Sequence, residues 1–186
     1  MLKPLYPEIR VPGSGPLLAI FTTSHGEITV ELDESAAPKS VRTFVGLALG
    51  TQPFRDARLQ RVVEGGESFY QDTTFHRVVP DFLIQGGDRL GTGFGGPGFR
   101  IADELTGRHD ERGVLSVAHS GPTTAASQFF LTARAAPWLD GVHTVLGTIV
   151  HGHAVVRDIS HVPADERDRP LRPVKLRSIQ IRHATP

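Results

Sequence analysis

Hydrophobic residues fall mostly into short runs with a period of two, separated by turns rich in glycine and proline. Alternation over four to eight residues is typical of a half-buried strand. The pattern therefore predicts a mainly β domain. Its strands are expected at Leu17–Phe21, Glu27–Leu32, Thr74–Val78, Phe82–Gln85, Gly113–Ala118, Gln128–Thr132, Thr144–Val150 and Val174–Ile181.

The last of these runs changes phase partway along. Its apolar residues alternate as far as Leu176 and resume at Ile179, one residue out of step. Because a slip of one residue turns every side chain to the other face, we expect a β-bulge near Arg177-Ser178. With that bulge, the apolar positions should all be mostly buried, namely Val174, Leu176, Ile179 and Ile181.

Two segments have helical periodicity instead. Pro38 suits the first turn of a helix, apolar residues follow at spacings of three and four as far as Leu49, and Gly50 offers a C-terminal stop. A second helix is predicted over His153–Ile159, with Ala154, Val155 and Ile159 turned inward. Residues 51–70 are charged and have neither period, which predicts a long exposed loop.

The first sixteen residues differ from the rest of the chain. They contain four prolines and two glycines, so we expect an irregular arm at 1–16, followed by one domain at 17–186. The N-terminus lacks the apolar core of a secretion signal. No uninterrupted apolar stretch approaches the roughly 18 residues that span a bilayer. These features predict a soluble cytoplasmic protein.

Composition narrows the possible functions. Acidic and basic residues number 20 each, which gives no electrostatic indication of nucleic acid or an anionic membrane as a partner. The chain has no cysteine. This excludes disulfides, a thiol nucleophile and thiolate metal sites.

Three motifs suggest other chemistry, but each has a simpler structural interpretation. The glycine-rich run at 91–98 lacks the Gly-Lys-Ser/Thr ending of a phosphate-binding loop, so a surface turn is expected. His151 and His153 lack carboxylates at ligand spacing and are interpreted as surface residues. Ser127, with His143 and Asp140 nearby, lacks the surroundings of a hydrolase nucleophile and more simply shapes a turn.

The most informative residues lie in two runs, Phe75–Asp88 and Ser127–Leu131. The first sets an arginine, a phenylalanine and a glutamine among apolar residues and ends at Gly-Gly-Asp. If two strand segments flank a turn at Pro80-Asp81, then Arg77, Phe82 and Gln85 converge on one surface. The second run adds another amide and more aromatic surface.

These runs, with Trp138-Leu139-Asp140-Gly141 and His143 behind them, resemble the signature of the cyclophilins, the cyclosporin-binding family of peptidyl-prolyl cis–trans isomerases. The resemblance covers roughly residues 17–182. The strand pattern alone is compatible with a sandwich or a barrel. The resemblance implies a closed eight-stranded antiparallel β-barrel capped by two α-helices.

The resemblance also implies an activity, namely isomerisation of X–Pro bonds in flexible or folding polypeptides, without a cofactor or a metal. Arg77 matches the family residue that donates to the proline nitrogen as the amide twists, and Gln85 the residue that orients it. Gln128 is expected to help hold Arg77 and the substrate. His76 is expected to be structural, and Phe75, Val78 and Phe129 to belong to the core.

The remaining site residues match family positions that grip the substrate or ligand. Ala118 and His119 are expected to offer backbone hydrogen bonds, Trp138 to contact a cyclosporin-like ligand, and His143 to lie at the edge of a hydrophobic cup for the proline ring. That cup is expected to consist of Phe82, Leu83, Phe130 and Leu139.

Some positions depart from the family pattern. Leu83 stands where methionine is usual, His119-Ser120 replaces Asn-Ala, and Thr123–Ala126 replaces Asn-Thr-Asn-Gly. We expect these changes to affect substrate preference and not the core chemistry. The alternative function is a module of the same fold that binds proline-containing segments with little turnover, and the retained Arg77 argues against it.

Overall fold

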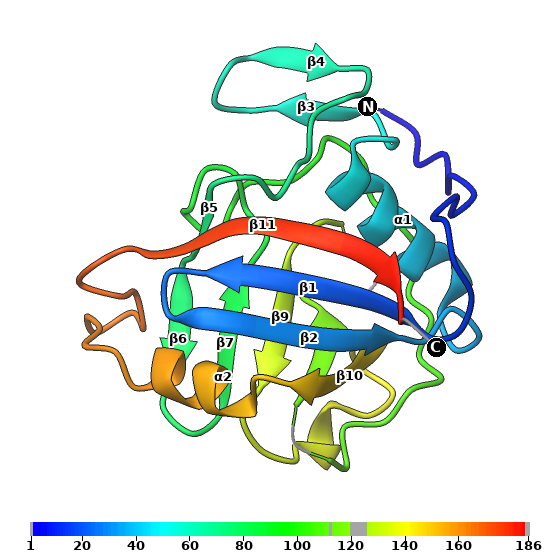
Figure 1. Cartoon of the computed structure of the whole chain (residues 1–186). Coiled ribbons are helices and arrows are strands. Elements are labelled where there is room, and N and C mark those ends of the chain that lie inside the picture. Colours follow the sequence, from blue (N-terminus) through cyan, green and yellow to red (C-terminus); the bar gives the residue numbers. More distant parts are fainter. Residues whose placement is uncertain (1, 112, 120–125, 185–186) are drawn as a thin grey trace.

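The computed structural model describes residues 2–111, 113–119 and 126–184. In these ranges nine strands form one antiparallel sheet that curls into a barrel, with α1 and α2 on opposite sides of it (Figure 1). The strand order is β5-β11-β1-β2-β10-β8-β9-β7-β6. The strands are β1 (Leu17–Thr23), β2 (Gly26–Leu32), β5 (Thr73–Phe75), β6 (Arg77–Val79), β7 (Leu83–Gly86), β8 (Val114–Val117), β9 (Phe129–Thr132), β10 (Val145–His151) and β11 (Val174–His183).

The barrel differs from the predicted closed, eight-stranded one at the run Thr73–Val79. This run changes partner at His76, because β5 pairs with β11 whereas β6 pairs with β7. One predicted strand is therefore two, and they lie at opposite ends of the strand order. An isolated bridge between Thr74 and Asp88 links β5 to the end of β7. The barrel is nearly closed, and the predicted count and complete closure are corrected.

The predicted bulge in the last strand is confirmed. Thr22 pairs with Ser178 but Thr23 pairs with Leu176, so Arg177 is the extra residue of β11. All four predicted apolar positions are buried, namely Val174, Leu176, Ile179 and Ile181. The bulge therefore keeps both halves of β11 facing the core.

Both helices were predicted correctly in position. α1 (Pro38–Leu49) begins at its proline and ends at Gly50, whose φ of 71° is the left-handed conformation of a helix C-cap. α2 (His153–Ser160) buries Val156 and Ile159. Ala154 is exposed, so the predicted inward face of α2 is wrong by part of a turn.

Residues 51–70 are not the long exposed loop that their charge predicted. A small hairpin, β3 (Phe54–Asp56) with β4 (Arg61–Val63), stands apart from the barrel (Figure 1). Phe54 and Phe69 are buried, and the Arg89 guanidinium lies over both rings while its Nη2 contacts Asp56 Oδ2 at 2.7 Å. The buried residues are too widely spaced to give a periodic signal.

The barrel interior is centred on Phe129. Its ring meets four other buried aromatic rings at centroid distances of 5.5–6.3 Å, those of Phe21, Tyr70, Phe44 and Phe75. These edge-on contacts are a favourable geometry for aromatic pairs. Because β9 alternates, the next residue, Phe130, faces the opposite side of the sheet.

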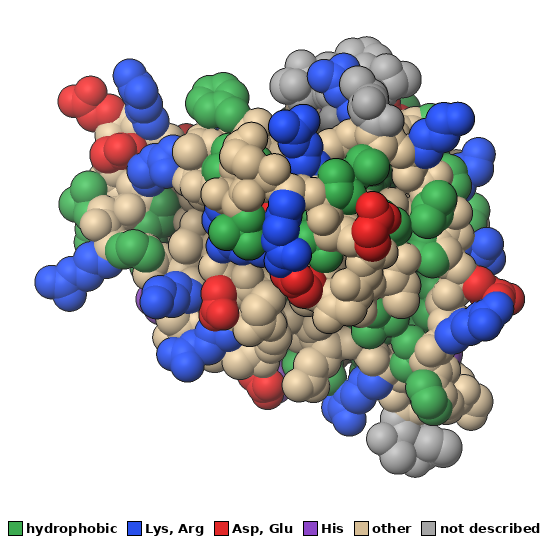
Figure 2. Space-filling model, turned by 90° about the horizontal axis from the view of Figure 1, so that it is seen from above, with side chains coloured by type: hydrophobic (Ala, Val, Ile, Leu, Met, Phe, Trp, Pro, Cys, Tyr) green, Lys and Arg blue, Asp and Glu red, His purple; other side chains and the backbone are tan. Residues whose placement is uncertain are grey.

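Residues 2–16 run beside α1 without a helix or strand (Figure 1). The Leu5 N–H donates to Gln52 Oε1, and Leu2, Tyr6, Ile9 and Val11 pack against the core. On the face seen in Figure 2, cationic and anionic side chains are interspersed with hydrophobic ones. Within the described ranges, the length and apolarity needed to cross a membrane are found in no helix.

Candidate functional site

A row of side chains crosses four neighbouring strands on the outer face of the sheet. Cross-strand pairing places Arg77 of β6 opposite Gln85 of β7, Gln85 opposite Phe130 of β9, and Phe130 opposite Ser116 of β8. Because side chains alternate along each strand, these four residues share a face. Their inward neighbours Val78, Ile84, Leu131 and Leu115 are buried in the core. The predicted convergence of Arg77 and Gln85 is confirmed.

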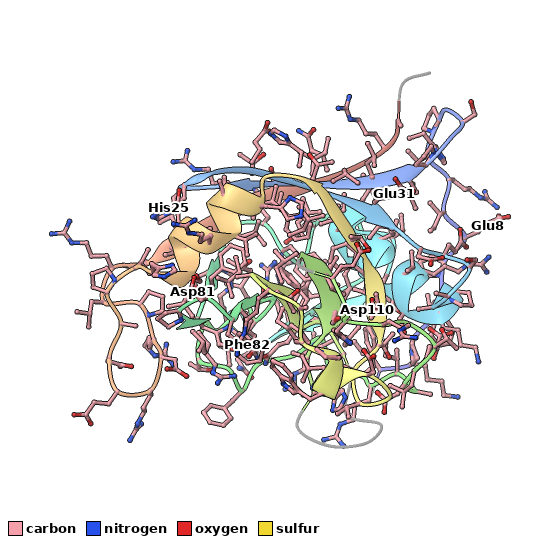
Figure 3. All side chains as sticks on the ribbon, turned by 90° about the horizontal axis from the view of Figure 1, so that it is seen from below. Glu8, His25, Glu31, Asp81, Phe82 and Asp110 are labelled. Atoms are coloured by element: carbon pink, nitrogen blue, oxygen red, sulfur yellow. The ribbon has the colours of Figure 1, made fainter. Side chains whose placement is uncertain are left out.

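The turn between β6 and β7 places Phe82 next to this row. The Phe82 N–H donates to the Val79 carbonyl at 3.0 Å, and Asp81 has a φ of 54°, as in a turn that reverses the chain tightly. In Figure 3, Asp81 lies beside α2, where its carboxylate is 3.2 Å from His161 Nε2. The hairpin turn is thus tied to α2.

Phe82 is half-buried and part of an aromatic surface. Its ring centroid lies 5.8 Å from that of Trp138, which is 56 % exposed on the 3₁₀ turn η1 (Pro137–Leu139). The Arg134 guanidinium lies over both rings, at 5.7 and 5.4 Å from their centroids. Cation–π contact of this kind holds the two rings in place. Leu83 and Leu139 are buried and half-buried respectively.

A second group of rings borders Phe130. The His143 ring lies edge-on to Phe130, with centroids 5.1 Å apart, and His119 packs against His143 at 4.3 Å. Each histidine is held by a backbone carbonyl, because His143 Nδ1 donates to Val117 and His119 Nε2 donates to Val142. Burial, then repulsion from the neighbouring His119, lowers the pKa of His143, so its neutral form is favoured.

The two glutamines connect the row to the glycine-rich loop. Gln85 Nε2 donates to Gln128 Oε1 at 3.1 Å, and Gln128 Nε2 donates to the carbonyls of Gly93 and Gly95. These amides border a cavity of about 590 Å³, which is also lined by Phe94, Ala118 and His119. The Ala118 N–H already donates to the Gln128 carbonyl. Of the residues expected to edge this region, Ala126 lines the cavity, whereas Ser120 and residues 123–125 lie outside the described residues.

Asp88 also fixes the glycine-rich loop at 91–98. Its carboxylate is buried and accepts the N–H groups of Leu90, Thr92 and Gly93. Burial alone would raise the pKa of Asp88, but these backbone donors outweigh it and lower the pKa. A charged Asp88 therefore fixes the loop that carries Phe94.

Arg77 has a partner that the sequence did not indicate. Its Nε donates to Asp168 Oδ2 at 3.1 Å, across 91 positions of the chain. Gln85, expected to orient Arg77, lies opposite it on β7 and donates its Nε2 to Gln128. Asp168 lies in a charged segment without periodicity, so no sequence pattern identified it. Arg134 was missed because it lies between alanines just after the strand motif, where nothing marks it as a site residue. Phe94 by contrast stands out as the one aromatic residue at 91–98.

The alternative sites are not assembled. Asp140 contacts His109 rather than His143, and His109 Nε2 lies 2.8 Å from Ser116 Oγ. Ser116 and His109 are fully buried, so this Ser–His–Asp arrangement is closed to substrate. Ser127 is buried and donates to the Gly87 carbonyl, as expected of a turn residue. The described ranges contain no group of three or more His, Cys, Asp or Glu side chains placed to bind a metal ion.

His76 is buried, as expected of a structural residue. Because successive side chains of an extended segment point to opposite faces, His76 points away from the face that carries Arg77. The site thus presents one half-exposed guanidinium beside apolar rings, side-chain amides and a cavity. Such a surface can bind an extended peptide and donate hydrogen bonds to it. The described part of this surface exposes no nucleophile paired with a base. The arrangement therefore suits non-covalent chemistry.

Comparisons with known proteins agree with this geometry. Residues 18–181 match the family model described as "Cyclophilin type peptidyl-prolyl cis-trans isomerase/CLD". The chain is 41 % identical over 169 residues to peptidyl-prolyl cis-trans isomerase A of Mycobacterium tuberculosis, covering 88 % of this chain and 91 % of that protein. It is 40 % identical over 159 residues to the isomerase ppi1 of Schizosaccharomyces pombe, covering 83 % and 92 %.

Solved structures are similar as well. A cyclophilin-type isomerase of Cryptosporidium parvum superposes with a TM-score of 0.76 at 30 % identity, covering 93 % of this chain and 100 % of that one. The same protein, crystallised in the presence of the dipeptide Ala-Pro, gives a TM-score of 0.75 at 29 % identity, covering 90 % and 99 %.

Proposed function

The chain belongs to the cyclophilin-type peptidyl-prolyl cis–trans isomerases, and from that membership we propose which of its residues carry out the isomerisation. Arg77 is the proposed catalytic residue. Gln85 and Phe82 act beside it. The observation that carries this proposal is the row Arg77–Gln85–Phe130, which sets a half-exposed cationic donor on the same face of the sheet as the buried ring of Phe130, with Gln85 between them.

Isomerisation needs no covalent intermediate. Rotation about an amide C–N bond faces a barrier of roughly 18–20 kcal/mol, because resonance gives that bond partial double-bond character. For X–Pro bonds, exchange takes tens to hundreds of seconds, although the two isomers differ little in energy. To bring this into milliseconds, a catalyst must lower the barrier by roughly 5–7 kcal/mol, at about 1.36 kcal/mol for each tenfold.

Arg77 can lower the barrier by binding the twisted amide better than the planar one. When resonance is lost, the proline nitrogen regains a lone pair that accepts a hydrogen bond. A guanidinium stays charged at all working pH values and has N–H groups besides the Nε–H that Asp168 accepts. Arg77 is 44 % exposed, so these groups are accessible to a bound peptide.

The proposed substrate is a proline-containing segment of a flexible or folding polypeptide. The proline ring would contact the half-buried ring of Phe82 and the edge formed by Phe130 and His143. Leu83 and Leu139, which are buried and half-buried, are proposed to complete this cup. Ala118 and His119 line the cavity, and their backbone groups other than the Ala118 N–H are proposed to hydrogen-bond an extended peptide. Gln128 holds Gln85 beside the cavity. The structurally similar isomerase of Cryptosporidium parvum was crystallised in the presence of the dipeptide Ala-Pro, which supports this substrate class.

Trp138 is proposed to contact a cyclosporin-like ligand, because its indole is exposed at the rim of the aromatic surface. The division into an arm at 1–16 and an isomerase domain at 17–186 also remains a proposal. The cytoplasmic location stays a prediction.

One experiment tests the proposed function directly. Exchange NMR on a short X–Pro peptide measures how fast its cis and trans signals interconvert, with the protein and with the Arg77→Ala variant, each with and without cyclosporin. We expect the protein to accelerate exchange, the variant to lose most of that acceleration, and cyclosporin to block it. Peptide binding without accelerated exchange would instead favour the proline-binding module.

A further inference from the structure

The segment 161–173 between α2 and β11, here called the strap, is built around one tight turn. The Asp165 carboxylate accepts the N–H groups of Arg167 and Arg169, and the Asp165 N–H donates to the Arg169 carbonyl. Asp168 lies within this turn and has a φ of 62°. This left-handed conformation is uncommon for residues other than glycine, asparagine and aspartate. The strap therefore presents the Asp168 side chain in a defined direction.

The strap is fixed to the site at two points. The Val78 N–H donates to the Asp168 carbonyl at 2.8 Å, which attaches the turn to β6 directly after Arg77. The Arg169 guanidinium donates to the carbonyls of Gly91 and Thr92 at 2.6 and 3.2 Å, which attaches it to the glycine-rich loop. Asp168 is thus held next to Arg77 by one main-chain bond and by the side chain of its neighbour Arg169, none of which involves the Asp168 carboxylate.

The carboxylate of Asp168 accepts the Nε–H of Arg77 at 3.1 Å. The two side chains are 41 % and 44 % exposed. A contact at Nε restrains the plane of the guanidinium at its inner end and leaves the two Nη groups available for a substrate. Gln85, the neighbour of Arg77 across the strand pair, donates its Nε2 to Gln128, whereas the Nε–H of Arg77 is bound by Asp168.

We infer that Asp168 is a positioning residue for the isomerisation, whose carboxylate fixes the guanidinium of Arg77 toward the bound X–Pro bond. This inference rests on the catalytic role proposed for Arg77. A long flexible side chain that is oriented before the substrate arrives loses less freedom in the twisted state. Asp168 thereby assists kcat and contributes little to the binding of the planar substrate.

The positive φ of Asp168 determines which substitutions can test its role without straining the backbone. Asn and Gly both tolerate a left-handed backbone, so Asp168→Asn and Asp168→Gly avoid the strain that alanine would add. The Asn variant removes the charge and keeps an oxygen acceptor, whereas the Gly variant removes both. Glu166→Gln is the matched control, because Glu166 is an exposed acidic residue of the same strap.

NMR line-shape measurement on an X–Pro peptide gives kcat and KM separately. We expect kcat to fall by about three- to tenfold in Asp168→Gly, with a smaller loss in Asp168→Asn and an unchanged KM, since a half-exposed ion pair has a modest effect that positioning amplifies. The ¹H–¹⁵N signal of the Arg77 Nε–H should broaden or shift in the same order. Glu166→Gln should match the wild type in both measurements.

Two results would overturn the inference, and they can be told apart. If Arg77→Ala abolishes activity while both Asp168 variants keep the wild-type kcat, Arg77 is catalytic but Asp168 does not position it. If Arg77→Ala retains activity, the proposed role of Arg77 fails, and that of Asp168 fails with it. In the Arg77→Ala background, Asp168→Gly should have no further effect on kcat. A further loss there would also contradict positioning through Arg77.

Discussion

His119 and His143 pack against each other at the edge of the site, with ring centroids 4.3 Å apart and planes tilted by 32°. Two protonatable rings at this distance repel when both are charged. Burial and this repulsion lower the pKa of His143, and the hydrogen bond to the Val117 carbonyl opposes them. The site thus keeps His143 neutral beside Phe130.

The His143 pKa gives a prediction about pH. Its folded-state pKa lies below the unfolded value of about 6.5, so its contribution to stability is fully present above pH 6.5 and is lost as pH falls toward the folded pKa. Replacing His119 by Asn removes the neighbouring charge and part of the burial, and should raise the pKa of His143. NMR titration of the His143 ring proton measures it. An unchanged titration curve would exclude His119 as a cause.

Replacing Arg77 by Ala should lower kcat/KM at least a hundredfold. Loss of one preorganised donor to a developing charge costs on the order of 2.7–4 kcal/mol. The thermal midpoint should shift little, because Arg77 is half-exposed and its ion pair contributes little to stability. Arg182→Ala, an exposed arginine on β11, is the control and should leave turnover intact. Near-normal turnover in Arg77→Ala would remove Arg77 from the mechanism.

Phe94 should influence which peptides are preferred. It is 95 % exposed, lines the cavity beside Gln85, and sits on a loop fixed by Asp88 and Gln128. Phe94→Ser should lower kcat/KM about three- to tenfold for peptides with a large apolar side chain two or three residues before proline, because apolar contact is lost.

For a peptide with glycine at those positions, the wild type and Phe94→Ser should have the same kcat/KM. Leu171→Ser is the matched control, since Leu171 is also an exposed apolar residue but does not line the cavity. A uniform loss over the whole peptide panel would argue against a role in selectivity.

Deleting Arg177 should leave β11 in register with β1. The pairs Leu176–Thr23 and Ser178–Thr22 become consecutive, so Val174 and Leu176 stay on the buried face and stability should change only modestly. Deleting the exposed Gln180 instead should turn Ile181 outward, because that half of β11 has no bulge to absorb the change. Exposing a buried aliphatic side chain costs about 1.5–3 kcal/mol, which a urea titration measures. Equal midpoints for the two deletions would show that the bulge does not reconcile the two apolar phases.

The fold was predictable from sequence wherever periodicity was strong. The phase change between Leu176 and Ile179 located the bulge, and Pro38 with Gly50 bounded α1. The partner change at His76 was not predictable, because a continuous run such as Thr73–Val79 carries no mark of which strand each half will pair with. The hairpin β3–β4 was missed because its buried residues lie among charged ones.

The candidate site was predictable where its residues belong to motifs. The row Arg77–Gln85–Phe130 follows from strand alternation and from the turn at Pro80-Asp81. The contact between Arg77 and Asp168 was not predictable. It joins a strand to a segment without periodicity, and only the folded barrel brings the two together.

The division of the run Thr73–Val79 has a consequence for the order of folding. The row of the site is built from strands within residues 77–132, whereas closing the barrel requires Phe75 to pair with Val174, after the strap. Pairings so distant in sequence form slowly. A chain emerging from the ribosome can therefore pair β6, β7, β9 and β8 before the strap is made, but Arg77 meets Asp168 only after the strap follows. Closure of the barrel and the contact between Arg77 and Asp168 thus both depend on the last part of the chain.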